Sequence, residues 1–199
     1  MTDLASEMTT RPVQIGPLMR DLGEEPAAVP GDAVCRPAST LILGLGNPIL
    51  GDDGAGWRVA EMFRSAIGSC YTPRDLALEL DCFSGGGLAL MERILGCQRV
   101  ILIDAMQTGA ADIGEVRVCR LEDLANPGAG HSSSAHDATL LTALELARAV
   151  GAAIPARIDV VGIEISRAVN FADTVTESVS RALPRAVEAV LDLLEEEAR

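Results

Sequence analysis

The sequence predicts an α/β protein, a three-layer α/β/α sandwich with a mainly parallel sheet of about five strands. Short apolar runs next to glycine or an acidic residue, such as 41–43 and 99–105, are typical of strands buried on both faces. Segments with helical spacing of apolar residues alternate with these runs along the chain. No run approaches the roughly eighteen apolar residues of a membrane span. These observations together favour a globular α/β domain.

The elements are predicted in order from the strand Leu41–Leu43. Turn residues at Asn47 and Pro48 follow it, and Asp52 and Asp53 stand where helical spacing begins. The later elements are, in chain order, a helix over 54–67, a strand over 76–83, a helix over 88–95, a strand over 99–105, a strand over 115–121, a helix over 137–150, a strand over 157–165 and a helix over 172–197. We expect a kink in the last helix at Pro184, because proline removes a backbone hydrogen bond.

Composition limits the domain organisation and the partners. Residues 1–39 are rich in proline and lack a periodic apolar face, which predicts an amino-terminal arm or tail before a single domain over 40–199. The net charge of −13 argues against a nucleic-acid or anionic-membrane partner. The five cysteines are widely spaced without a Cys-x-x-Cys pair, which predicts reduced thiols and no zinc site. We therefore expect a cytoplasmic protein, and a monomer.

The glycine-rich stretch 44–56 does not fit the two common phosphate-binding motifs. A dinucleotide fingerprint requires a glycine where Ile49 stands, and a Walker-type loop requires a lysine, which the chain lacks entirely. One carboxylate at a helix start is explained by capping of free backbone N–H groups. For Asp52 and Asp53 together, capping and a functional role are both open.

Three residues are candidate metal ligands. Asp53 follows the first predicted strand and Asp104 stands at the end of the strand over 99–105, so they share the carboxyl edge of the sheet if those strands are parallel neighbours. Asp104 has the alternative of accepting backbone hydrogen bonds in its loop. His136 precedes a predicted helix, whose dipole keeps imidazole neutral, whereas we expect His131 to be exposed to solvent. Two carboxylates and an imidazole suit zinc or nickel better than calcium or magnesium.

A serine nucleophile is a weaker alternative. Ser84 precedes three glycines, which resembles a nucleophile on a tight turn. The Gly-x-Ser-x-Gly motif needs glycine at both flanking positions, and Cys82 occupies one of them.

Four motifs resemble those of the hydrogenase maturation endopeptidases. They are the series G-L-G-N-P-I-L-G-D-D-G-A-G-W-R-V at 44–59, the strand ending I-L-I-D-A at Ala105, the S-S-A-H loop at His136, and V-V-G-I-E at 160–164. The resemblance implies an α/β/α endopeptidase that removes a carboxy-terminal peptide from the [NiFe]-hydrogenase large-subunit precursor after nickel insertion. It also implies that Asp53, Asp104 and His136 are the catalytic and metal-contacting residues, with nickel carried by the substrate. A non-catalytic nickel-checkpoint or assembly factor on the same fold, and a serine hydrolase using Ser84, are the alternatives.

Overall fold

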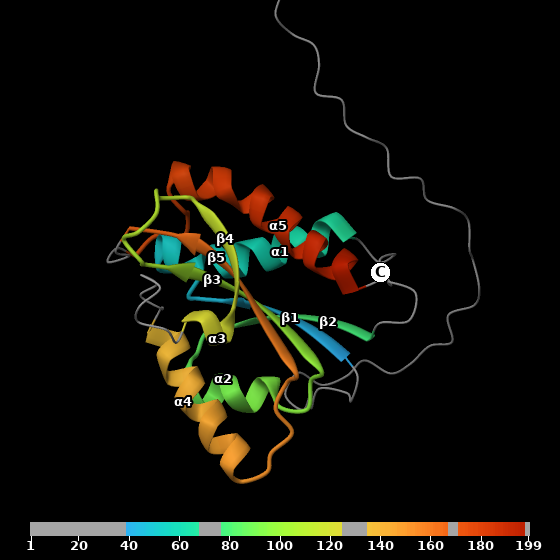
Figure 1. Cartoon of the computed structure of the whole chain (residues 1–199). Coiled ribbons are helices and arrows are strands. Elements are labelled where there is room, and N and C mark those ends of the chain that lie inside the picture. The colour runs from blue at the N-terminus through green and yellow to red at the C-terminus, as the bar shows by residue number, and fades with distance from the viewer. Residues whose placement is uncertain (1–38, 68–76, 125–134, 167–170, 198–199) are drawn as a thin grey trace, which may run out of the picture. The chain divides into compact units, whose positions relative to one another are not determined.

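The computed structural model describes residues 39–67, 77–124, 135–166 and 171–197, and its centre is a five-stranded sheet (Figure 1). The strand order is β2-β1-β3-β5-β4. All neighbours pair in parallel except β4, which is antiparallel to β5. The strands are β1 (Ser39–Leu45), β2 (Ala77–Phe83), β3 (Arg99–Met106), β4 (Val116–Arg120) and β5 (Arg157–Glu164). The predicted fold class, a mainly parallel sheet of about five strands, is confirmed.

Helices cover both faces of this sheet. One face is covered by α1 and α5, and the other by α2, α3 and α4 (Figure 1). The helices are α1 (Ala55–Ile67), α2 (Gly87–Ile94), α3 (Leu121–Leu124), α4 (Ala135–Ala149) and α5 (Glu177–Glu197), with a short 3-10 helix, η1 (Gly51–Gly54), before α1. The arrangement is the three-layer sandwich that the alternating pattern predicts.

The apolar strands explain the two covered faces. Successive side chains of a strand point to opposite faces, so Leu41 and Leu43 pack on the α2 and α4 side while Ile42 packs beneath α1 and α5. In β3 the same alternation divides Leu102 from Ile103, and every residue of that strand is buried. A continuous apolar run is therefore what a central strand with two covered faces requires.

The last helix begins later than the sequence predicts. The apolar spacing suggests a start at Ala172, but α5 begins at Glu177. Ala172 instead forms an isolated parallel bridge with Leu50, so this segment pairs with the loop after β1. Pro184 lies inside α5 as expected, and the kink there stays a prediction.

The cysteines differ in part from the expectation of reduced thiols. Cys82 and Cys119 are not disulfide-bonded, and burial raises the pKa of the Cys82 thiol above its usual value. Cys97 is disulfide-bonded, so the prediction is wrong for this residue.

Two other expectations concern the chain as a whole. The predicted arm, 1–39, lies outside the described residues except for its last position, so the division into arm and domain stays a prediction. Within the described parts of the chain, no helix has both the length and the apolar character that crossing a membrane demands.

Candidate functional site

The loops that follow β1 and β3 leave the sheet at the same edge. The two strands are parallel neighbours, with Leu43 opposite Leu102 and Gly44 opposite Ile103. The condition under which Asp53 and Asp104 share the carboxyl edge is therefore met.

Glycines bring the start of α1 close to this edge. A side chain at Gly56 would overlap the carbonyl oxygens of Ile103 and Leu45, so only glycine lets the first turn of α1 lie against β1 and β3. Gly46 has a φ of 117°, and a side chain there would overlap the backbone carbonyl of Asp53. The glycine spacing of the 44–56 stretch thus serves close packing of a loop that carries carboxylates.

Asp53 is held by its own loop and is partly exposed. Its Oδ2 accepts a hydrogen bond from the backbone N–H of Asn47 at 2.8 Å. No hydrogen bond from the described residues reaches its other oxygen, Oδ1. This contact orients the carboxylate and leaves one oxygen for a ligand.

The neighbouring Asp52 has a different environment. It is buried, and its Oδ1 accepts a hydrogen bond from the backbone N–H of Thr176 at 2.6 Å, while its Oδ2 accepts one from the Thr176 hydroxyl at 2.9 Å. No side chain caps the start of η1. The interpretation that Asp52 caps the helix that follows it is therefore wrong. Asp52 instead connects its loop to Thr176, the residue that precedes α5.

Asp104 is buried at the carboxyl end of β3. Its Oδ1 accepts the backbone N–H of Ala105 at 2.9 Å, so the alternative role of accepting backbone hydrogen bonds is observed at this oxygen. This bond occupies one of the two acceptor oxygens of the carboxylate, and Asp104 takes part in at least one further interaction as well. Asp104 thus has a structural contact without being excluded as a metal ligand.

The histidine of the proposed set is only partly described. His136 lies in the first turn of α4, one residue after the helix begins. Its side chain and the whole of His131 lie outside the described positions, so the assembly of Asp53, Asp104 and His136 stays a prediction. Among the described side chains, which do not include that of His136, no group of three His, Cys, Asp or Glu residues is placed to hold a metal ion.

Glu164 is a buried carboxylate at the same edge whose role sequence reasoning did not assign. It ends β5 and accepts hydrogen bonds from the Thr108 hydroxyl at 2.6 Å and the Gly109 N–H at 2.8 Å. These contacts brace the loop after β3. The available signal was an acidic residue at the end of an otherwise apolar strand.

Ser84 is not arranged as a nucleophile. Its hydroxyl donates a hydrogen bond to the Gly46 carbonyl at 2.7 Å, and the Gly46 N–H donates to the Phe83 carbonyl at 3.3 Å. An activated serine gives its proton to a base such as histidine. Here the hydroxyl extends the pairing of β1 with β2.

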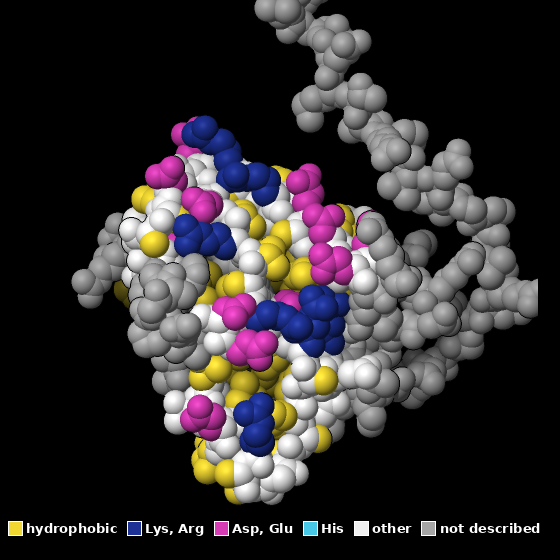
Figure 2. Space-filling view, in the orientation of Figure 1, with side chains coloured by type: hydrophobic (Ala, Val, Ile, Leu, Met, Phe, Trp, Pro, Cys, Tyr) yellow, Lys and Arg dark blue, Asp and Glu magenta, His cyan; other side chains and the backbone are white. Residues whose placement is uncertain are grey.

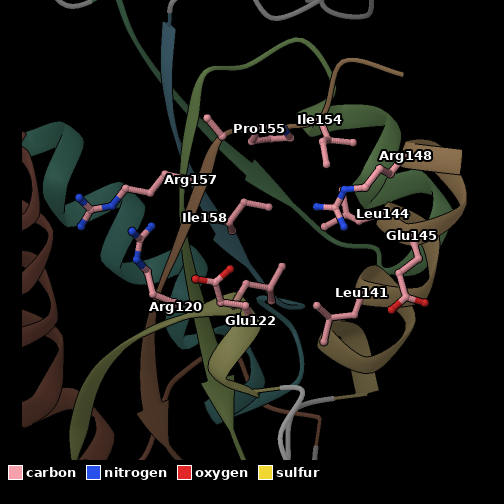
Figure 3. A pocket seen from close by; sticks show the side chains of 12 residues that line it. Arg120, Glu122, Leu141, Leu144, Glu145, Arg148, Ile154, Pro155, Arg157 and Ile158 are labelled. Atoms are coloured by element: carbon pink, nitrogen blue, oxygen red, sulfur yellow. The ribbon is translucent and has the colours of Figure 1, made fainter. Parts of the chain in front are cut away.

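A cleft lies elsewhere, at the amino edge of the sheet. It measures about 330 Å³ and lies between the end of β4, α4 and the chain before β5 (Figure 3). Arg120, Arg148, Glu122 and Glu145 line it above an apolar floor. Basic and acidic side chains are interspersed on this face, so it presents no field of one sign (Figure 2). Among the candidate residues whose side chains are described, which are Asp53, Ser84 and Asp104, none borders this cleft.

Comparisons with known proteins agree on one family. A family model described as HycI, hydrogenase maturation protease, matches residues 80–193. The hydrogenase maturating endopeptidase HybD from E. coli is 25% identical, with a TM-score of 0.62 over 80% of this chain and 93% of that one. The [NiFe] hydrogenase maturation protease HybD from Thermococcus kodakarensis is 23% identical, with a TM-score of 0.56 over 78% and 98%, and supports the fold. A comparison with curated proteins finds no sequence match.

Proposed function

The chain belongs to the hydrogenase maturation protease family, and from this premise we propose that it removes the carboxy-terminal peptide of a [NiFe]-hydrogenase large-subunit precursor after nickel insertion. One observation carries the proposal. The family match spans Asp104 and His136, and glycine packing brings the Asp53 loop against the strand that carries Asp104. We place this reaction in the cytoplasm and assign it to a monomer.

We assign recognition of the substrate's nickel to Asp53, Asp104 and His136. Carboxylate and neutral imidazole are suitable donors for a divalent transition metal. The open Oδ1 of Asp53 faces no competing donor among the described residues, and burial of Asp104 strengthens its electrostatic interaction with a cation. In this proposal the nickel belongs to the substrate and is not a resident cofactor of the protease.

Because the three proposed ligands do not complete the coordination of nickel, cleavage depends on nickel that the precursor already holds. Two carboxylates and one imidazole leave further coordination positions, which the precursor's own nickel ligands fill. A precursor without nickel lacks this attachment point and binds weakly, which is how a protease distinguishes loaded from unloaded substrate. In hydrolysis, water adds to the scissile carbonyl, the C–N bond breaks and the amine leaves with a proton. If the substrate's nickel also polarised the carbonyl or the water, it would supply Lewis-acid catalysis to this step.

Contacts around Ser84 weigh against the serine-hydrolase alternative. Its hydroxyl donates to the Gly46 carbonyl, which cannot accept and relay a proton as a histidine does. The other alternative, a non-catalytic checkpoint factor, uses the same residues to bind the precursor. It differs from the protease only in leaving the precursor at full length.

The test is to mix the protein with nickel-loaded and nickel-free large-subunit precursor and to measure intact mass. We expect the loaded precursor to lose its carboxy-terminal peptide while the nickel-free one keeps its mass. Binding without any loss of mass would support the checkpoint factor and overturn the protease. Efficient cleavage of a rigorously nickel-free precursor would overturn the recognition mechanism.

A further inference from the structure

Two large apolar side chains are exposed beside the Asp53 loop. The Phe171 side chain is 85% exposed and the Ile49 side chain is 56% exposed, whereas most large apolar side chains of this protein lie in the buried core. Single exposed apolar residues are common on protein surfaces and need no explanation. The position of these two relative to one another is the informative feature.

The backbone aligns the two residues. Leu50 and Ala172 form a parallel bridge, in which the Gly51 N–H donates to the Ala172 carbonyl at 2.8 Å and the Ala172 N–H donates to the Ile49 carbonyl at 3.1 Å. Ile49 and Phe171 each precede a bridged residue. Residues at the same offset from a parallel bridge point to the same side of the two segments. We treat the exposed side chains of Ile49 and Phe171, which come from segments far apart in the sequence, as one apolar surface.

Further contacts hold the segment of Phe171 in place. The Arg58 side chain donates from Nη2 to the Asp173 carbonyl at 2.7 Å. Asp52 accepts two hydrogen bonds from Thr176, a few residues farther along. The apolar surface is therefore built on a segment tied to η1 and α1, and a prearranged surface loses less conformational entropy on binding.

Resting on the proposed function, we propose that Ile49 and Phe171 form the docking surface for an aliphatic or aromatic side chain of the large-subunit precursor next to its cleavage site. The occupant follows from continuity with the site. Ile49 lies on the same loop as Asp53, so a peptide whose scissile bond reaches this carboxylate passes over the loop. Covering an exposed aromatic side chain contributes strongly to the free energy of binding, because burial of apolar area drives association and aromatic residues contribute most at interfaces.

The experiment measures precursor processing by Phe171→Ala, Ile49→Ala and the double variant, with Val150→Ala as the matched control. Val150 is also exposed, at 75%, but follows the end of α4 that lies farthest from His136. For Phe171→Ala we expect KM for nickel-loaded precursor to rise about tenfold, with kcat nearly unchanged, as for an anchor that contributes to binding alone. Phe171→Leu should recover part of the affinity, and thermal melting of all variants should match the wild type.

Two results would overturn the proposal, and they are distinguishable. A wild-type KM in the Phe171→Ala and double variants, beside normal processing by the wild type, would remove the docking surface and leave the proposed function intact. Failure of the wild-type protein to process loaded precursor would instead contradict the proposed function, and the precursor would then no longer be the expected occupant of this surface. A rise in KM for Val150→Ala equal to that for Phe171→Ala would show a general surface effect and also contradict the assignment.

Discussion

The two edges of the sheet both bury carboxylates, but they satisfy them by different means. At the amino edge, Asp159 is buried among arginines. Arg99 donates to its Oδ2 from Nε at 3.0 Å and from Nη2 at 2.9 Å, and Arg157 donates from Nε at 2.7 Å. Arg99 is buried too, and its Nη1 donates to the Leu193 carbonyl at 3.0 Å. Charge is neutralised within the protein at this edge.

At the carboxyl edge, the hydrogen bonds of Asp52, Asp53 and Glu164 come from uncharged donors. Asp52 and Glu164 accept bonds from backbone N–H groups and hydroxyls, and Asp53 accepts one from a backbone N–H. Within the described ranges, none of these three takes part in an ion pair. Among the described side chains, no ion pair therefore cancels the charge of Asp52 or Asp53, whereas Glu164 interacts electrostatically with Arg117. An edge with such carboxylates favours a cation from outside. Both edges contain buried acidic side chains, so burial alone does not distinguish them. What distinguishes the structural edge from the candidate site is whether the partners of those acids are charged.

The largest expected effect is loss of processing when the proposed metal contacts are changed. Asp104→Asn and His136→Ala should each abolish cleavage of nickel-loaded precursor, because asparagine keeps the size of aspartate but removes its charge. Combining the two should add little further loss, since groups that act on one metal are strongly non-additive. Intact mass of the precursor measures the outcome.

Ser84→Ala and His131→Ala are the controls for this prediction, and both should retain processing. Asp104→Asn should also stay folded, since the Ala105 N–H keeps an acceptor. Near-normal processing by Asp104→Asn would refute its assignment. Unfolding of that variant would instead show that Asp104 stabilises the fold, as Asp159 does at the amino edge.

A smaller effect, on stability alone, is expected at the amino edge. Asp159→Asn removes an anionic group that pairs with the buried Arg99, and breaking a buried ion pair from one side typically costs about 3 kcal/mol or more. Urea unfolding should show this loss in the free energy of unfolding, while folded protein still processes precursor. Arg120→Met is the control, because this half-exposed arginine lies 3.7 Å from Asp159 and should contribute less than about 1 kcal/mol. Equal losses in the two variants would contradict a buried network centred on Arg99.

The sequence predicts the fold well where local pattern decides it. The strand expected over 99–105 is observed as Arg99–Met106, because a run buried on both faces leaves an unmistakable apolar pattern. The antiparallel direction of β4 carries no such local signal, since it depends on which neighbour the strand pairs with. The start of α5 was misplaced because Val175 continues the helical spacing while the bridge of Ala172 to Leu50 is a long-range contact.

The candidate site is predictable in part for the same reason. The meeting of the Asp53 loop with the end of β3 follows from parallel neighbouring strands, which the alternating pattern indicates. The different environments of Asp52 and Asp53 do not follow, because the hydrogen bonds of Asp52 come from Thr176, far along the chain. The partners of Asp159 are equally long-range, so the sequence alone did not reveal the buried ion pairs at the amino edge.

Asp52 and Asp53 allow the same comparison, of a structural with a metal-contacting carboxylate, within one loop. Asp52→Asn should weaken the tie to Thr176 and cost about 1–2 kcal/mol of unfolding free energy, because a buried acceptor with two short hydrogen bonds loses its charge. Asp53→Asn keeps an oxygen for the Asn47 N–H, and its stability should change by less than about 1 kcal/mol.

Processing of nickel-loaded precursor by these two variants, measured by intact mass on samples whose folded fraction is known from urea unfolding, tests the central claim most directly. We expect Asp53→Asn to be folded and inactive, and Asp52→Asn to be destabilised but active per folded molecule. Normal processing by Asp53→Asn, or inactivity of folded Asp52→Asn alone, would contradict the division between a structural and a metal-contacting carboxylate.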